Sequence, residues 1–147
     1  MDYREAYEKA LQLLNVRFLS EGELKAKLRR RGADDEVLEA VVAALEAEHF
    51  LADQRLARDV YHSYARKGQY GHLYIVNRLR RRCLPIPEDI ERPDEYALAG
   101  ALVKRKFSYR ADEVRKAARF LQYRGFSPSV IRDVLDDFTL RSGDDDG

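Results

Sequence analysis

Residues 20–32 read SEGELKAKLRRRG, a stretch that contains the start and the end of one helix. Ser20 and Glu23 have the spacing of a capping box, in which a hydroxyl and a carboxylate accept hydrogen bonds from the first free N–H groups of a helix. Two leucines, one turn apart, follow on a single face. Gly32 comes directly after three arginines and is typical of the residue that ends a helix in the left-handed conformation. The stretch therefore predicts a short amphipathic helix with both boundaries defined.

The same helical spacing continues along the rest of the chain. Apolar residues lie three and four positions apart, and no comparable run alternates in twos. Such stripes occupy residues 37–45, 56–64, 75–79, 98–102 and 130–138. Asp34 opens an acidic first turn, and Ser127 precedes Pro128 as an N-cap precedes a proline at the first helical position. We therefore expect an all-α fold.

The chain repeats itself three times at constant spacing. An acidic residue is followed 4 positions later by alanine, 26 later by leucine, 29 later by arginine and 30 later by glycine or cysteine. The copies begin at Asp2, Asp53 and Glu95, and none of them needs a gap. Small repeats of this kind bury their apolar faces by stacking on their neighbours. We therefore expect an elongated, curved array of three tandem, helix-turn-helix-like repeats of three helices each.

These repeats divide the chain into residues 1–50, 51–92 and 93–140, followed by a tail over 141–147. Three prolines bracket the third helix of the middle repeat and leave it about one turn, residues 88–92. The tail is polar and ends in Gly-Asp-Asp-Asp-Gly, so we expect a disordered acidic segment there.

The charges nearly cancel in total but not by position. Lys and Arg number 27 and Asp and Glu 26, which gives a net charge of +1. Residues 1–50 carry −3, residues 51–92 carry +4, and residues 93–147 carry 0. The near-neutral total excludes a simple basic tail or an acidic activator. The middle third is nevertheless a basic band.

Several chemistries lack their sequence signals. Cys83 is the one cysteine, and no two of the three histidines are spaced four apart, so we expect no disulfide and no metal site. No nucleotide-binding or hydrolase motif is present, so we expect no cofactor and no enzyme activity. Without a secretory signal or an apolar run of membrane length, a cytoplasmic protein is expected.

Two arginine triplets, Arg29–Arg31 and Arg80–Arg82, stand at the same place in the first two repeats. Cations at the C-terminal end of a helix offset its dipole, which accounts for one or two arginines but not for three. We therefore predict contact with an acidic surface or with phosphate groups. The full candidate set is Arg29, Arg30, Arg31, Arg58, Arg66, Lys67, Arg78, Arg80, Arg81 and Arg82.

The middle repeat also interleaves cations with tyrosines. Arg58 and Arg66 share one helix face, and Tyr70 and Tyr74 precede Arg78 at helical spacing. Such interleaving suits contact with single-stranded nucleic acid, because rings stack on bases while cations follow the backbone. The interpretation that we favour instead puts three tyrosines at the edge of the core with their hydroxyls in water: Tyr61, Tyr64 and Tyr74.

These motifs resemble those of the RecX family, regulatory proteins that act on the RecA recombinase. The first repeat carries Arg17-x-x-Ser20-x-x-Glu23-Leu24-x-x-x-Leu28-x-x-x-Gly32. The middle repeat carries Leu51-x-Asp53-x-x-x-Ala57-x-x-x-Tyr61, then Lys67-Gly68 and Ile75-x-x-x-Leu79. The third carries Lys104 to Phe107, Ala118, Leu121 and Arg124-Gly125-Phe126. The resemblance covers residues 5–138, and Cys83 departs from it by standing where the family has glycine.

The resemblance implies a clamp-like regulator that binds the RecA–DNA filament. It implies inhibition of the ATPase, strand-exchange and co-protease activities of RecA, and thereby regulation of DNA repair, homologous recombination and the SOS response. No enzyme activity of its own is implied. The expected partner is the RecA filament, with contact to the single-stranded DNA inside it left open. We expect a monomer that does not bind a membrane.

Two other classes of function stay open. One is a helix-turn-helix-like nucleic-acid-binding module that acts without RecA, for which affinity would fall steeply with salt. The other is a helical-repeat adaptor for a different protein.

Overall fold

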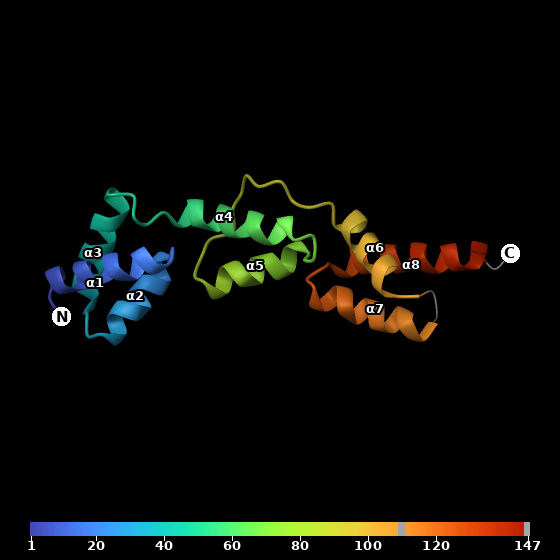
Figure 1. Cartoon of the computed structure of the whole chain (residues 1–147), viewed down its shortest axis with the longest axis horizontal. Helices are drawn as coiled ribbons and strands as arrows, with labels where there is room; N and C mark the ends of the chain where they lie inside the picture. The colour runs from blue at the N-terminus through green and yellow to red at the C-terminus, as the bar shows by residue number, and fades with distance from the viewer. Residues whose placement is uncertain (109–110, 146–147) are drawn as a thin grey trace. The chain divides into compact units, whose positions relative to one another are not determined.

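The computed structural model describes residues 1–108 and 111–145, and this part of the chain contains eight helices and no strand (Figure 1). The helices are α1 (Tyr3–Val16), α2 (Glu21–Arg30), α3 (Asp35–Ala47), α4 (Asp53–Arg66), α5 (His72–Arg81), α6 (Glu95–Lys106), α7 (Ala111–Tyr123) and α8 (Pro128–Asp145). The all-α helical repeat fold is thereby confirmed. The elongated, curved arrangement of the repeats stays a prediction.

The middle repeat has two helices, whereas the first and third repeats have three each. Residues 82–94 run from α5 to α6 without a helix, so the single turn expected over residues 88–92 is absent. Pro85, Pro87 and Pro93 account for the difference. Proline lacks the N–H that a helix needs and also disfavours the helical conformation of the residue before it.

The helices begin at their predicted caps. At α2, the Ser20 hydroxyl accepts a hydrogen bond from the Glu23 N–H at 3.0 Å, and the Glu23 carboxylate accepts one from the Ser20 N–H at 2.9 Å. This completes the capping box. The Asp34 carboxylate caps α3, and the Ser127 hydroxyl accepts from the Val130 N–H at the start of α8. Each cap of this kind typically stabilises its helix by about 1 kcal/mol.

The second helices of the three repeats end alike. Gly32, Cys83 and Gly125 have φ angles of 98°, 58° and 85°, all in the left-handed region. In each repeat the following N–H donates back to the carbonyl of the repeated leucine, at 3.2, 2.9 and 3.1 Å. This closure is typical of helix C-termini and favours glycine, because a Cβ is strained there. Equivalent geometry at equivalent positions confirms the repeat.

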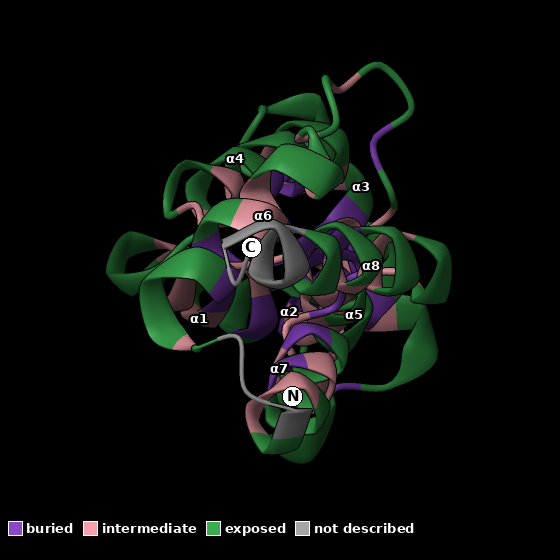
Figure 2. Cartoon of the chain, turned by 90° about the vertical axis from the view of Figure 1, so that its right-hand side faces the viewer, coloured by how far each residue is buried: buried purple, intermediate pink, exposed green. Residues whose placement is uncertain are grey.

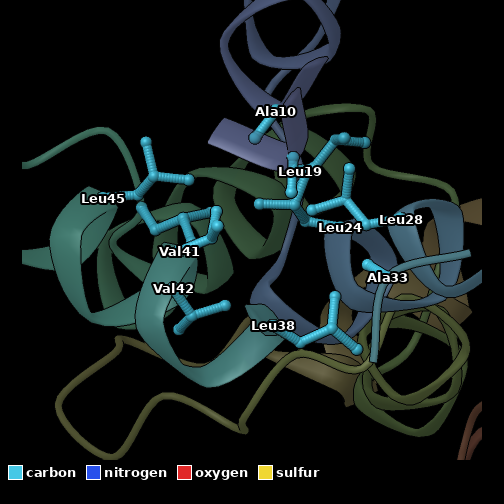
Figure 3. Close-up of a cluster of buried hydrophobic side chains, with 11 residues drawn as sticks. Ala10, Leu19, Leu24, Leu28, Ala33, Leu38, Val41, Val42 and Leu45 are labelled. Atoms are coloured by element: carbon cyan, nitrogen blue, oxygen red, sulfur yellow. The ribbon is translucent and has the colours of Figure 1, made fainter. Parts of the chain in front are cut away.

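The described chain forms two compact units. The first unit comprises residues 1–60 and 79–88, and the second comprises residues 61–78 and 89–147. The core of the first unit lies among α1, α2 and α3, whose apolar side chains point toward one another in Figure 3. The labelled members of this core are Ala10, Leu19, Leu24, Leu28, Ala33, Leu38, Val41, Val42 and Leu45.

The second unit has its own core among α6, α7 and α8. Its fully or nearly fully buried members are Ala99, Leu102, Val103, Ala117, Leu121, Phe126, Val134 and Phe138. Figure 2 shows that exposed residues cover the outer surfaces of the helices. This distribution is that of amphipathic helices, each of which buries one stripe.

Tyr61 lies deeper than predicted. It is fully buried, and its hydroxyl is hydrogen-bonded to Nδ1 of His72 at 2.8 Å rather than to water. Tyr64 and Tyr74 are half-buried, as expected for the edge of a core. A buried tyrosine hydroxyl requires a polar partner, and the imidazole supplies it.

The C-terminal helix is longer than the sequence predicts. A disordered tail is expected over residues 141–147, but α8 extends to Asp145. The last two residues lie outside the described part of the chain.

Candidate functional site

The last arginine of the second triplet is bound inside the first unit. The Arg82 guanidinium donates to both carboxylate oxygens of Glu23, at 3.1 and 3.2 Å, and to the carbonyl of Phe18 at 2.8 Å. The Arg82 and Glu23 side chains are 21% and 20% exposed. Two parallel hydrogen bonds between an arginine and a carboxylate are strong and geometrically specific. Arg82 therefore holds the end of α5 to the start of α2.

The backbone completes this contact, which we call the α2/α5 junction (Phe18, Ser20, Gly22 and Glu23 with Arg82 and Cys83). The Ser20 hydroxyl donates to the carbonyl of Arg82 at 2.5 Å. A Cβ added to Gly22 would lie 2.6 Å from the Cβ of Cys83, so the two segments touch closely. The junction thus joins the C-terminal end of one second helix to the N-terminal turn of another.

The electrostatics of Glu23 reflect this junction. Burial acts to raise the pKa of its carboxyl, but the hydrogen bonds from Arg82 and from the Ser20 backbone lower it more. The net pKa lies below the usual range. The carboxylate is therefore ionised at neutral pH and serves both the cap of α2 and the arginine.

A second junction repeats this arrangement inside the second unit. The Arg124 guanidinium donates to the Gln69 side-chain oxygen at 3.1 Å and to the Gln69 carbonyl at 3.4 Å. The Gly71 N–H donates to the carbonyl of Arg124 at 2.8 Å. Gly71 also approaches Gly125 so closely that an added Cβ would lie 2.5 Å from the Gly125 carbonyl oxygen. We call this contact the α5/α7 junction (Gln69, Gly71 and Leu73 with Arg124 and Gly125).

The two junctions use equivalent positions. A shift of 51 residues maps Phe18 onto Gln69 and Ser20 onto Gly71, and the repeat maps Arg82 onto Arg124. In both junctions the arginine donates to the carbonyl at the first of these positions. The arginine 29 positions into each of these two repeats therefore fastens that repeat to the preceding second helix.

The repeated acids reinforce the same helix starts. The Asp53 carboxylate accepts a hydrogen bond from the Glu21 N–H at 2.9 Å, and the Glu95 carboxylate accepts one from the His72 N–H at 2.7 Å. Each acid thus caps the second helix of the preceding repeat, where a negative charge is favoured by the helix dipole. Burial raises the pKa of Asp53, although the Glu21 N–H acts in the opposite direction.

The first arginine triplet has different surroundings. Arg29 pairs with Asp35 at 3.2 Å, an exposed contact worth little in stability. Arg30 and Arg31 are exposed, and no described residue forms an ion pair with either. They line a hollow of about 220 Å³ together with Lys27 and Leu13. This triplet forms the C-terminal end of α2, whereas Arg82 contacts its N-terminal end. The ten residues of α2 span about 15 Å.

The other candidates are spread over both units. Arg80 and Arg81 are exposed beside Arg82 in the first unit, and Arg58 is exposed on α4. Arg66 is exposed in the second unit, and its Nε donates to the His62 carbonyl at 3.4 Å. Exposure leaves all four guanidinium groups accessible from water.

Lys67 and Arg78 belong to an aromatic cluster in the second unit. Tyr70 and Tyr74 stack with their centroids 4.1 Å apart and their planes 8° apart. Arg78 covers Tyr74, with 5.0 Å from Cζ to the ring centroid, and donates to its hydroxyl at 2.8 Å. Arg124 covers Tyr70 at 5.3 Å.

This stack covers one face of each ring, which a base can then no longer use. Each tyrosine has one ring face covered by the other tyrosine and a guanidinium 5.0 or 5.3 Å from its ring centroid, and Tyr64 meets both rings edge-on. Lys67 lies over Tyr64 at 5.0 Å. Cation–π contacts of this kind typically contribute about 0.5–1 kcal/mol at exposed sites. The cluster therefore favours a role in packing the second unit over a role in stacking bases.

Sequence reasoning missed the roles of Arg82, Arg124 and Glu23 in the junctions. The repeat itself carried a usable signal, because Arg82 and Arg124 occupy the same repeat position. Arg31 occupies that position in the first repeat, where it is exposed and no described residue pairs with it.

No group of three or more His, Cys, Asp or Glu side chains that could hold a metal ion occurs in residues 1–108 and 111–145. No helix in that part of the chain has the length and apolar character to cross a bilayer.

Comparisons with known proteins place two regions of the chain in one family. The model described as "RecX, first three-helix domain" matches residues 6–45, and the model described as "RecX, third three-helix domain" matches residues 93–135. The regulatory protein RecX of Pelodictyon phaeoclathratiforme is 33% identical over 145 residues, covering 93% of this chain and 91% of the relative. That of Leptothrix cholodnii is 34% identical over 135 residues, covering 86% and 85%.

A solved structure shares the fold. The crystal structure of RecX from Lactobacillus salivarius superposes with a TM-score of 0.76, covering 95% of this chain and 97% of that one. The sequence identity is 22%, so this likeness speaks for the fold alone.

Proposed function

Because this chain belongs to the RecX family of regulatory proteins, we propose that it binds the RecA–DNA filament and inhibits the recombinase. In this proposal the protein acts in the cytoplasm by binding and performs no catalytic step of its own. Inhibition of RecA ATPase, strand exchange and co-protease activity would restrain DNA repair and recombination.

The observation that carries the proposal is a pair of exposed arginines at each of two helix ends. Arg30 and Arg31 end α2, and Arg80 and Arg81 end α5, with all four side chains exposed. The dipole of a helix end does not require so many cations. Arginine suits bidentate contact with carboxylates and phosphates, both of which a protein–DNA filament presents.

The experiment is a titration of the protein into RecA on single-stranded DNA, with ATPase and strand exchange as readouts. We expect both activities to fall as the protein reaches a stoichiometric ratio to RecA. Unchanged activity at a large excess of protein would refute the proposal.

A charge reversal locates the surface. The variant Arg80→Glu/Arg81→Glu leaves the junction residue Arg82 in place, and it should inhibit on the order of tenfold less well because it removes two accessible cations and adds two anions. The matched control is Arg4→Glu/Arg132→Glu, which changes net charge by the same amount at exposed positions on α1 and α8. Equal inhibition by both variants would move the surface away from the end of α5.

A nucleic-acid module that acts without RecA is the second candidate. The location of Arg66, Lys67 and Arg78 in the same unit favours it. The stacking of Tyr70 on Tyr74 counts against base stacking as its mechanism, because it covers one face of each ring. Binding to naked DNA equal to binding to the filament would support this candidate over the first.

A further inference from the structure

The end of α2 is chemically the same as the two helix ends that form junctions. Each of these three ends carries the repeated arginine followed by a left-handed residue. At Arg82 and Arg124 the guanidinium donates to a carbonyl and to a side-chain oxygen, and the arginine's own carbonyl accepts from Ser20 or Gly71. A helix N-terminal turn therefore fits this kind of end.

In the first repeat this end has no such neighbour. Arg31 and Gly32 are exposed, and a Cβ added to Gly32 would meet nothing within 4 Å. At Gly125 an added Cβ would instead lie 2.2 Å from the Tyr74 N atom. Among the described residues, none donates a hydrogen bond to the Arg31 carbonyl. The surface that the other two repeats bury is open here.

We propose that the C-terminal end of α2 docks the N-terminal turn of a helix in a partner protein. That turn presents a backbone carbonyl and a carboxylate to the Arg31 guanidinium, a small residue to Gly32, and an N–H or hydroxyl to the Arg31 carbonyl. The inference rests on the proposed function in one respect: the protein that this chain regulates supplies the helix.

Charge and shape argue for this occupant. Lys27, Arg30 and Arg31 surround the hollow at the end of α2, so an acidic helix start is attracted. Leu13 provides an apolar wall for the side of that turn. A phosphodiester of nucleic acid would satisfy the cations, but it has no donor for the Arg31 carbonyl. A capped helix start satisfies both, as the α2/α5 junction demonstrates.

The test is a titration of the full ¹⁵N-labelled chain, followed by NMR. The probe is a blocked peptide of residues 17–24, which carries the turn that Arg82 contacts, extended by an alanine-rich helical tail. We expect amide shift changes centred on residues 30–33. The same peptide with Glu23→Gln should bind about tenfold more weakly, because it loses a charge-assisted hydrogen bond.

Two protein variants separate the site from general charge. Arg31→Gln should bind the peptide about tenfold more weakly, whereas Arg29→Gln, whose side chain pairs with Asp35, should bind like the wild type. Equal losses in both variants, equal affinity for both peptides, or shifts away from residues 30–33 would overturn the proposal. So would inorganic phosphate that competes at the same site with higher affinity than the peptide.

Three further outcomes are distinguished. A concentration-dependent dimer of the unliganded protein, in which the amides of residues 30–33 are protected from hydrogen exchange, would identify a second copy as the occupant. That result would overturn the proposal. Inhibition of RecA by Arg31→Gln at wild-type strength, together with failed peptide binding, would refute this inference but not the proposed function. Peptide binding without any inhibition of RecA would refute the proposed function but not this inference.

Discussion

One arginine position has three different surroundings in this chain. Arg82 meets a carboxylate and a carbonyl, Arg124 meets an amide, a carbonyl and a tyrosine ring, and Arg31 meets water. The residue type and its place in the helix are the same in all three cases. What differs is whether a preceding second helix supplies acceptors. The contribution of the arginine to the free energy of unfolding should therefore differ among the three repeats as well.

The substitution Arg82→Gln should lower the free energy of unfolding by about 2 kcal/mol, because it breaks a half-buried bidentate ion pair and leaves the Glu23 carboxylate without its partner. Arg31→Gln should change it by less than about 0.5 kcal/mol, as is usual for an exposed side chain. Urea unfolding followed by circular dichroism measures both. Equal losses would show that the junction adds nothing to stability.

His72 makes stability depend on pH. Burial lowers its pKa below the usual 6.5, Arg92 acts in the same direction, and Glu95 opposes them. The fold therefore favours the neutral imidazole. The stabilisation from this group is fully present above pH 6.5 and is lost as the pH falls from there through the pKa in the folded protein.

The variant His72→Asn keeps a polar side chain near the Tyr61 hydroxyl but cannot titrate. We expect the wild type to lose more unfolding free energy than this variant between pH 7.5 and pH 5, two values chosen to bracket the window. The control His62→Asn changes an exposed histidine and should follow the wild type. Parallel pH profiles for all three proteins would contradict the assignment.

At the scale of the helix, the ends of the elements were the most predictable feature. The capping box at Ser20 and the left-handed ends at Gly32 and Gly125 depend on a few adjacent residues, so the sequence alone indicates them. The prolines of the middle repeat predict a third helix shortened to one turn. The structure has no helix there at all, so the prediction is only partly correct.

The junctions were not predictable in the same way. Arg82 and Glu23 are 59 positions apart, and their pairing depends on how α2 and α5 pack. A cluster of arginines in a sequence is equally compatible with a charged surface and with a buried ion pair. Exposure at Arg80 and Arg81 agrees with the predicted surface, but their binding role stays a prediction.

The left-handed helix ends supply a matched pair of substitutions. Gly32→Ala should cost about 1–2 kcal/mol, the usual cost of a Cβ in this conformation with open space around it. Gly125→Ala should cost about 3 kcal/mol or more, because the added Cβ also collides with the backbone at Tyr74. Thermal and urea unfolding compare the two. A smaller loss at Gly125 than at Gly32 would mean that the α5/α7 junction yields easily.

At the scale of the whole molecule, the distribution of charge matters more than its total. The net charge is +1, but residues 51–92 carry +4 and residues 1–50 carry −3. A protein that coats DNA without specificity relies on a large positive field. A nearly neutral chain with arginine-rich helix ends is less suited to that role. It is better suited to a partner that combines acidic protein surface with phosphate.

Salt dependence tests this view. Between 50 mM and 200 mM salt, a surface that contacts three phosphates of single-stranded DNA loses roughly 20-fold in affinity. We expect naked single-stranded DNA to show a fall of this size and the RecA–DNA filament to show less than about a tenfold fall. Fluorescence anisotropy with labelled DNA, bare or coated with RecA, gives both values. Equal salt dependence would favour direct DNA binding.

The Tyr70–Tyr74 stack also gives the second unit an optical signature. The chain contains nine tyrosines, six phenylalanines and no tryptophan, so tyrosine dominates its near-ultraviolet spectrum. Two phenol rings held 4.1 Å apart couple their electronic transitions, and this coupling adds to the circular dichroism of the individual rings. The loss of that signal marks the moment at which this unit loosens, without any label attached to the protein.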